Sequence, residues 1–505
     1  MKDYDKNNDI IISDQVIGYH ASKALEETSN KESSMENKSD VKSELSPFKE
    51  VMINAIPATM GLLFIFLVET INIIFIGRLN DAELISAIGL GTLYVNSTGF
   101  VIGLGLIGGI DTLCSQSYGA KEYKLMGIYM NIGRITVIMF FVILFLPFVI
   151  FCDTLLLAIG QTEEFAYICS KFAYSMIPSI FFALMYNVSV RYLQSMQIFL
   201  PGMLITLFTA IIHSLWCYIF IHLLSLDVIG AGIAIGITQF LNFLMITIYI
   251  NVKNPCPESN CSMTLESFDY AMILDYLMLA IPSTLLMAAD WLGFEVLTLM
   301  SSYLGNISLA ANVVLFNFIS IIFMISLGIS FAVTALVGNA MGSKNVQNAK
   351  KYSCVAILTG VCIVSITTSL VIIFREAIPY VYTSDERVAD LVKQLLDVYV
   401  FFSILDSIQI VEHGIVKGLG QQRNASICAF IILYPVNISN AYYLGFVLKY
   451  GVVGLWYSQL CSVVLLAFCY FIILFYCDWD KVSLDCVEKF NEERMDIELK
   501  SRKTN

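Results

Sequence analysis

The central part of this 505-residue sequence contains few charged residues. Residues 1–50 hold 18 of the 70 charged residues, residues 478–505 hold 14, and the 427 residues between them hold only 38. Charged residues make up 14% of the chain, against roughly a quarter in soluble domains, and the mean hydropathy is +0.75. This scarcity predicts an integral membrane domain between two solvated tails.

Other features are also missing, and each absence removes a class of function. The N-terminus "MKDYDKNNDIIISDQ" has no basic start before an apolar core, so no cleaved signal peptide is expected. No basic face with interleaved aromatic residues is present, which argues against nucleic-acid binding. The histidines His213, His222 and His413 fall at no ligand spacing, and nothing resembles a nucleophile with its base. We therefore expect no metal, no other cofactor and no enzyme activity.

One apparent cofactor motif is rejected on its context. The segment "GLGLIG" at 103–108 matches the dinucleotide-binding pattern GxGxxG. It lies inside an apolar run, with no preceding strand and no βαβ unit. Its glycines are interpreted as positions where helices approach closely.

Apolar runs long enough to cross a bilayer recur between residues 52 and 477. A span needs about 20 apolar residues, and the sequence predicts twelve spans. They are 52–76, 84–108, 127–152, 167–190, 201–224, 228–251, 270–298, 308–333, 352–376, 393–416, 424–447 and 452–477. Loops after even-numbered spans carry most of the loop Lys and Arg residues, so both tails are predicted to be cytoplasmic.

The spans also predict the domain organisation. The Ser-, Glu-, Asn- and Lys-rich residues 1–50 are predicted to be a disordered tail. Spans one to six form a first lobe (51–252), a cytoplasmic linker loop follows (253–269), and spans seven to twelve form a second lobe (270–477). A cytoplasmic tail (478–505) ends the chain.

Short motifs recur at a nearly constant distance along the chain. "AIPATM" at 55–60 recurs as "AIPSTL" at 280–285, an offset of 225, and "GAK" at 119–121 recurs as "GSK" at 342–344, an offset of 223. Repetition across six spans predicts two parallel six-helix repeats, with chance matches in a biased composition as the alternative. Transporters built this way bind substrate between the halves and alternate access.

Two carboxylates interrupt the apolar stretch "MLAIPSTLLMAADWLGFEVLTLMSSYLG" of span seven. Asp290 and Glu295 lie there beside Trp291 and Phe294. A carboxylate at mid-membrane costs about 2.5–3.5 kcal/mol on insertion scales, so such residues usually have a function. The alternative for each is a hydrogen bond to a neighbouring helix.

Span ten adds a third buried carboxylate. Asp406, Gln409 and His413 have i, i+3, i+7 spacing, which predicts one polar stripe facing the bundle interior or water. Burial disfavours the charged form of a carboxylate, and a neighbouring organic cation favours it, so proton and cation compete. With alternating access that competition is antiport. Trp291 and Phe294 would add cation–π contacts worth about 0.5–2 kcal/mol, ordinary packing being the alternative.

Several motifs occur in an order typical of one transporter family. They include "GIDTLCSQSYGAKEYKLMGIY" (109–129), "ALVGNAMGSKNVQNAKK" (335–351) and "VKGLGQQRNA" (416–425). Together they resemble the multidrug and toxic compound extrusion (MATE) family, especially its eukaryotic branch, over roughly residues 50–477. The resemblance implies an all-α, V-shaped, alternating-access transporter with twelve transmembrane helices.

The resemblance also implies site residues. "DWLGFE" (290–295) resembles the family's Glu-Trp-Trp-x-aromatic-Glu signature, so Asp290, Glu295 and Asp406 are expected to bind protons and cations. The departures are Asp290, one methylene shorter than Glu, and Leu292 in place of the second Trp.

Other positions follow from the same resemblance. Asn96, in "NSTG", and Asn317, where some animal members carry an acid, are expected in the substrate cavity with Trp291, Phe294 and Gln409. Asn72 stands where many bacterial members carry Asp. It is a secondary candidate, together with Glu69 and His413.

The function predicted is a proton-coupled exporter of small organic cations, drugs or cationic metabolites. The alternatives are sodium coupling, a lipid-linked flippase, which would need a basic cavity, and a cation channel, which would need symmetric acid rings. The chain is expected to be a monomer in the lipid bilayer of the plasma membrane or an acidic organelle.

Overall fold

The computed structural model describes residues 46–77, 82–158, 160–259 and 262–504. Residues 51–505 form one compact unit. Of the predicted disordered tail, residues 1–45 lie outside the described residues, and residues 47–50 begin the first helix.

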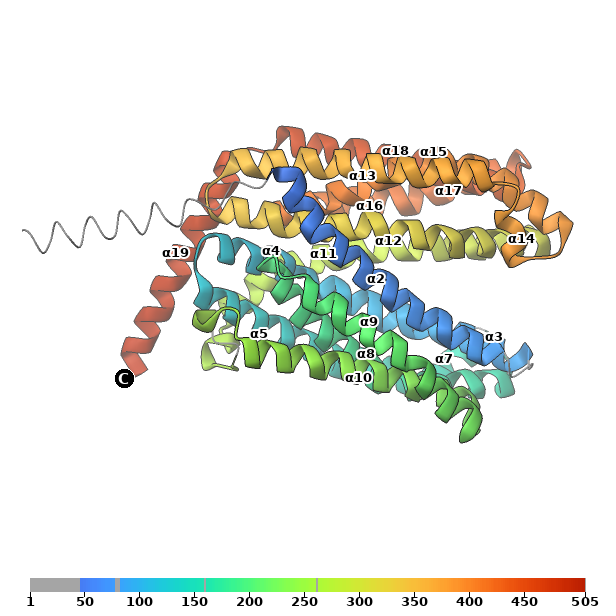
Figure 1. The fold of residues 1–505 in the computed structure, drawn as a ribbon, viewed down its shortest axis with the longest axis horizontal. Coiled ribbons are helices and arrows are strands. Elements are labelled where there is room, and N and C mark those ends of the chain that lie inside the picture. The colour runs from blue at the N-terminus through green and yellow to red at the C-terminus, as the bar shows by residue number, and fades with distance from the viewer. Residues whose placement is uncertain (1–45, 78–81, 159, 260–261, 505) are drawn as a thin grey trace, which may run out of the picture. The chain divides into compact units, whose positions relative to one another are not determined.

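The described part of the chain is built from helices, which Figure 1 shows. The first half contains α2 (Pro47–Gly77), α3 (Ala82–Val95), π-helical η1 (Asn96–Phe100), α4 (Val101–Gly119), α5 (Tyr123–Phe140), η2 (Phe141–Phe145), α6 (Leu146–Ile150), α7 (Cys152–Ala158), α8 (Glu163–Ser195), α9 (Leu200–Cys217), η3 (Tyr218–Leu223) and α10 (Asp227–Lys253). Two short 3-10 turns, η4 (Pro257–Ser259) and η5 (Leu265–Phe268), follow in the linker.

The second half repeats this plan. It contains α11 (Tyr270–Tyr303), α12 (Asn306–Gly342), α13 (Val346–Phe374), α14 (Ile378–Tyr382), α15 (Glu386–Leu419), α16 (Gln422–Ile431), η6 (Ile432–Val436), α17 (Asn437–Tyr442), η7 (Tyr443–Val447) and α18 (Gly451–Tyr476). The chain then continues into α19 (Trp479–Thr504).

Eleven helices of the described chain are long and apolar enough to cross a membrane. The predicted span that is not among these eleven is the tenth (393–416), which falls on α15. This helix has 34 residues and carries charged residues such as Asp397, Asp406 and Glu412. Helix α15 nevertheless packs against α12, α13 and α18, as a bundle helix does. The prediction of a twelve-helix, all-α membrane fold is confirmed.

Helices α4 and α12 run well beyond the predicted spans 84–108 and 308–333. Because their last turns are polar, the sequence predicted loops there. In the structure Gln116 and Asn339 are buried where the two helices meet. A Cβ on Gly119 would lie 2.7 Å from the carbonyl carbon of Asn339, and one on Gly342 would lie 2.8 Å from the backbone nitrogen of Ala120. The two backbones are therefore in direct contact, and we call this crossing the sealed end.

The contacts at the sealed end confirm the repeat. Gly119 lies against Asn339, and Gly342 lies against Gln116, so the two contacts interchange under the offset of 223. This reciprocity is what a two-fold relation between duplicated halves requires.

A second reciprocal pair lies further along the same helices. A Cβ on Gly105 of α4 would lie 2.9 Å from Thr284 Cβ of α11, and one on Gly328 of α12 would lie 2.7 Å from Thr59 Cα of α2. The two glycines are 223 residues apart and the two threonines 225. Each half thus packs its second span against the first span of the other.

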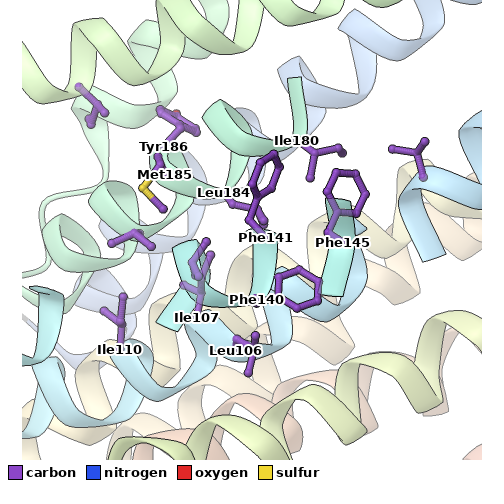
Figure 2. Close-up of a cluster of buried hydrophobic side chains, with 14 of the residues drawn as sticks. Leu106, Ile107, Ile110, Phe140, Phe141, Phe145, Ile180, Leu184, Met185 and Tyr186 are labelled. Carbon is purple, nitrogen blue, oxygen red and sulfur yellow. The ribbon is translucent and has the colours of Figure 1, made fainter. Parts of the chain in front are cut away.

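The rest of α4 is held by an apolar core within the first half. Figure 2 shows side chains of α4, α5, η2 and α8 meeting there, among them Ile107, Phe140 and Leu184. This packing fixes α4 from one side and leaves its glycine-rich side for the second half.

The structure corrects the prediction that residues 478–505 are a solvated tail. Helix α19 lies across the sealed end (Figure 1) and touches both halves. Ser483 Oγ donates to the carbonyl of Met341 at 2.7 Å, and the Tyr129 hydroxyl donates to the Glu493 carboxylate at 2.6 Å. Because Phe490 is buried among charged neighbours in the sequence, the high charge of this segment concealed an amphipathic helix.

Candidate functional site

A cavity of about 550 Å³ lies between the two halves. Its walls come from α2, α3, η1, α4, α8 and α9 of the first half and from α11, α12 and α15 of the second half. This volume falls within the roughly 300–1,000 Å³ typical of sites for small ligands.

The three predicted carboxylates of the second half all line this cavity. Asp290 and Glu295 project from α11, and Asp406 projects from α15. Asp406 interacts electrostatically with Asp290. The structure therefore brings together acids that are more than 100 positions apart in the sequence.

Aromatic side chains surround the acids. Trp291 and Phe294 line the cavity. The Phe294 ring also packs against Phe316, with centroids 5.5 Å apart, and against Trp456 at 6.4 Å. The Phe294 ring thus packs between helices and also faces the cavity.

Polar residues predicted at the cavity also lie there. Asn96 lines it at the first position of η1, a π-helical turn, and such turns are frequent at functional sites. Asn317 faces it from α12, with its amide donating to the carbonyl of Val313 at 2.9 Å. Glu69 of α2 lines it from the first half.

Three predicted site residues are not among the residues that line the cavity. Gln409 was expected to line it, whereas His413 and Asn72 were secondary candidates only. Gln409 is rotated by about 60° from Asp406 on α15, and it is buried beside Tyr470 of α18. His413 lies two turns from Asp406, closer to the sealed end, so the predicted stripe does not face one space. Asn72 is buried next to the Cys217 thiol, at 3.8 Å, inside the first half.

A row of charged groups between the cavity and the sealed end was missed from the sequence. Asp290 Oδ2 lies 3.6 Å from His413 Nδ1, Lys417 Nζ lies 3.9 Å from Asp111 Oδ2, and Asp111 Oδ1 lies 3.6 Å from Arg191 Nε. Arg191 and Lys417 directly follow the predicted spans 167–190 and 393–416, where the sequence predicts loops, but both are 8% exposed. We call these five residues the charge row.

The charge row joins the two halves. Asp111 and Arg191 belong to α4 and α8, whereas Asp290, His413 and Lys417 belong to α11 and α15. His413 and Lys417 are four residues apart, so they lie on the same side of α15.

Hydrogen bonds reinforce this junction. Thr112 Oγ1 donates to the carbonyl of Lys417 at 2.8 Å, and Gln116 Nε2 donates to the carbonyl of Gly418 at 2.9 Å. Gln422 Nε2 in turn donates to Thr112 Oγ1 at 2.6 Å. The end of α15 is therefore tied to α4.

A duplicated helical membrane protein with a polar cavity between its halves has the architecture of a secondary transporter. The MatE family model matches residues 57–219 and 282–443, one stretch in each half. The chain therefore belongs to the MatE family of membrane transporters.

Curated relatives cover most of the chain. Multidrug and toxin extrusion protein 1 of Homo sapiens is 29% identical over 444 residues, which cover 86% of this chain and 77% of that protein. The Danio rerio protein of the same name is 28% identical over 441 residues, covering 87% and 74%. Protein DETOXIFICATION 9 of Arabidopsis thaliana is 27% identical over 470 residues, covering 92% and 96%.

Solved structures share the fold. The crystal structure of the eukaryotic MATE transporter AtDTX14 aligns with a TM-score of 0.83 and 24% identity, covering 88% of this chain and 99% of that one. A MATE structure described as being in the bent conformation aligns with a TM-score of 0.76 and 19% identity, covering 88% and 97%.

Proposed function

We propose that this protein exports organic cations in exchange for protons. The observation that carries the proposal is that Asp290, Glu295 and Asp406 share one aromatic-lined cavity between the two halves. The curated relatives are named for multidrug and toxin extrusion, which supports this substrate class.

The cavity chemistry favours cations over anions. Four acidic residues, Glu69, Asp290, Glu295 and Asp406, and one basic residue, Arg191, are among its described lining residues. A flippase for anionic lipid-linked substrates would need the opposite balance. A hydrophobic cation would instead meet carboxylates and aromatic faces together.

Exchange follows from competition for the carboxylates. Asp290 and Asp406 repel one another when both are ionised, and either a bound cation or a proton relieves that repulsion. The two ligands thus displace each other, and rocking of the halves around the cavity converts displacement into antiport.

Protons are the proposed coupling ion, with sodium as the runner-up. Asn72, which stands in place of the acid found in many bacterial relatives, is buried against Cys217, so that position adds no carboxylate to the cavity. Coupling is therefore assigned to the second half, with a smaller contribution from Glu69. The cavity is complete within one chain, which supports a monomer. The excess of Lys and Arg in loops after even-numbered spans supports placing both termini in the cytoplasm.

The test uses purified protein in liposomes and a fluorescent organic cation. A pH gradient should drive cation movement, and an ionophore that collapses the gradient should stop it. Cation movement driven by a sodium gradient at equal pH would show that sodium, rather than protons, is the coupling ion. No movement under either gradient would refute antiport of this probe and favour a lipid-flipping assay.

Matched variants locate the coupling site. Asp290→Asn should abolish proton-driven exchange, and Glu69→Gln should weaken it much less. Glu164→Gln removes an exposed carboxylate at the start of α8 and should leave exchange unchanged. Equal damage from Asp290→Asn and Glu69→Gln would show that both halves couple.

A further inference from the structure

We propose that the charge row makes the sealed end sensitive to the protonation state of Asp290. This inference rests on the proposed function, because it assumes that Asp290 takes up a proton during transport. It assigns a coupling role to His413, Lys417 and Asp111, which lie behind the cavity wall.

The row begins in the cavity and ends between the halves. Asp290 is the one member that is appreciably accessible, with 20% of its side chain exposed, and it contacts His413 at 3.6 Å. One turn along α15, Lys417 faces Asp111 of the other half, which also faces Arg191. Lys417 and Arg191 are both buried, so both depend on nearby carboxylates.

The duplication explains why only one carboxylate, that of Asp111, lies between the two cations of the charge row. Arg191 in "VRYLQ" and Lys417 in "VKGLG" are 226 residues apart, so they are equivalent positions of the two repeats. The position equivalent to Asp111 is Thr334, 223 residues later. Two equivalent cations therefore converge on one carboxylate, and Asp290 supplies the second negative charge.

Charge balance then links the cavity to the sealed end. With Asp290 ionised, two carboxylates balance Arg191 and Lys417. When Asp290 is protonated, two buried cations are left with Asp111 alone, and the cluster carries a net positive charge. Such a charge is costly in a dry interior. Separation of the halves lets water reach Lys417, so protonation favours opening of the sealed end.

The net charge of the charge row is the same whether the proton is bound to Asp290 or to His413. A proton that moves from Asp290 to the adjacent imidazole leaves the net charge of the row unchanged and comes one turn closer to Lys417. The titratable groups that interact with Asp290 or His413 are Asp406 and Lys417 on α15, Asp111 on α4, Tyr434 on η6 and Tyr470 on α18. Of these, Lys417 and Asp111 connect the row to the other half.

Opening of the sealed end on protonation of Asp290 agrees with proton-driven export. The sealed end is predicted to face the cytoplasm, and the cavity would then receive protons from the opposite side. A proton that opens the sealed end is released where proton concentration is lower, and it leaves the cavity ready for a new cation.

The experiment measures hydrogen–deuterium exchange of the purified full-length protein at pH 7.5, without substrate. Asp290→Asn mimics permanent protonation, and exchange of residues 105–119 and 410–422 should become faster. Couplings between sites are typically about 5–150-fold, so we expect at least a ~5-fold increase. Asp290→Asn combined with Lys417→Met restores the charge balance and should return exchange to within about twofold of wild type. The single variant Lys417→Met completes the double-mutant cycle.

A control variant separates charge from damage. Glu164→Gln removes an exposed carboxylate outside both the cavity and the charge row, and should not speed exchange. Unchanged exchange in Asp290→Asn, or equal increases in the single and double variants, would overturn the coupling. Because no transport is measured, these results stand apart from the liposome assay.

Discussion

Replacing either Gly119 or Gly342 with alanine should loosen the sealed end, and by nearly the same amount. A Cβ at Gly119 would lie 2.7 Å from a backbone carbon of Asn339, and a Cβ at Gly342 would lie 2.8 Å from the backbone nitrogen of Ala120. Both obstacles are backbone atoms, so no side-chain rotation makes room. The helices themselves must separate.

The size of this effect follows from the distances. Carbon atoms in contact prefer separations of about 3.5–4.0 Å, so each added methyl group requires the crossing to widen by roughly 1 Å. Overpacking of this kind costs about 1–3 kcal/mol. In a protein that can open at this end, the cost appears as a shift toward the open state, and that energy corresponds to about 5–150-fold. The double variant should cost less than the sum, because the first substitution already widens the shared crossing.

Exchange of residues 105–119 and 328–342 measures this opening directly. Gly293→Ala is the matched control, because a Cβ at that position in α11 has no described atom within 4 Å. The two test variants should exchange faster than wild type by similar factors, whereas the control should match it. A change confined to one variant would refute the reciprocal crossing, and wild-type exchange in both would show that the backbones are not in contact there.

Three further predictions concern the charge row and α19. Thr334→Asp in the Asp290→Asn background should slow exchange at the sealed end, because it returns an acid to the position equivalent to Asp111; faster exchange would contradict the charge balance. Tyr129→Phe should weaken docking of α19 by about 1–3 kcal/mol, seen as faster exchange of residues 479–500, because it removes the donor to a buried carboxylate. Burial raises the pKa of Glu493 above its ordinary value of 4.5, so its contribution to docking is complete below pH 4.5 and is lost as the pH rises through the raised pKa. Corrected exchange of α19 should therefore be faster at pH 8 than at pH 5, and Glu493→Gln should remove the difference.

Much of the architecture was predictable because membrane folding leaves strong local signals. Apolar run lengths identified the spans, and two short motifs at nearly constant offsets identified the repeat. The acids of α11 stood out because a charge in an apolar run is costly wherever it faces. Their meeting with Asp406 in one cavity is a tertiary fact, which the family resemblance anticipated but spacing alone did not.

The misses share one physical cause, since composition does not say what covers a polar residue. Arg191 and Lys417 lie at the ends of apolar runs, where solvated loop cations are equally common, and only the packing of α4 between them makes them buried. Gln409 has suitable helical spacing, but α18 covers its side of α15. The charged surface of α19 likewise hid the few apolar residues that dock it.

The two halves differ in charge at a few equivalent positions. Ile65 and Asp290 are equivalent positions, 225 residues apart, and both line the cavity. One wall is thus apolar where the other is acidic, so in the proposed mechanism a cation is held mainly by the second half. Asp111 and Thr334 are also equivalent positions, but here the acid lies in the first half and the uncharged residue in the second. The glycine crossings are the same in both repeats, whereas these two departures from symmetry place one negative charge in the cavity and one between the cavity and the sealed end. In the proposed mechanism, a proton that binds Asp290 in the cavity changes the charge balance around Asp111, so protonation favours opening at one end of an otherwise symmetric pair of halves.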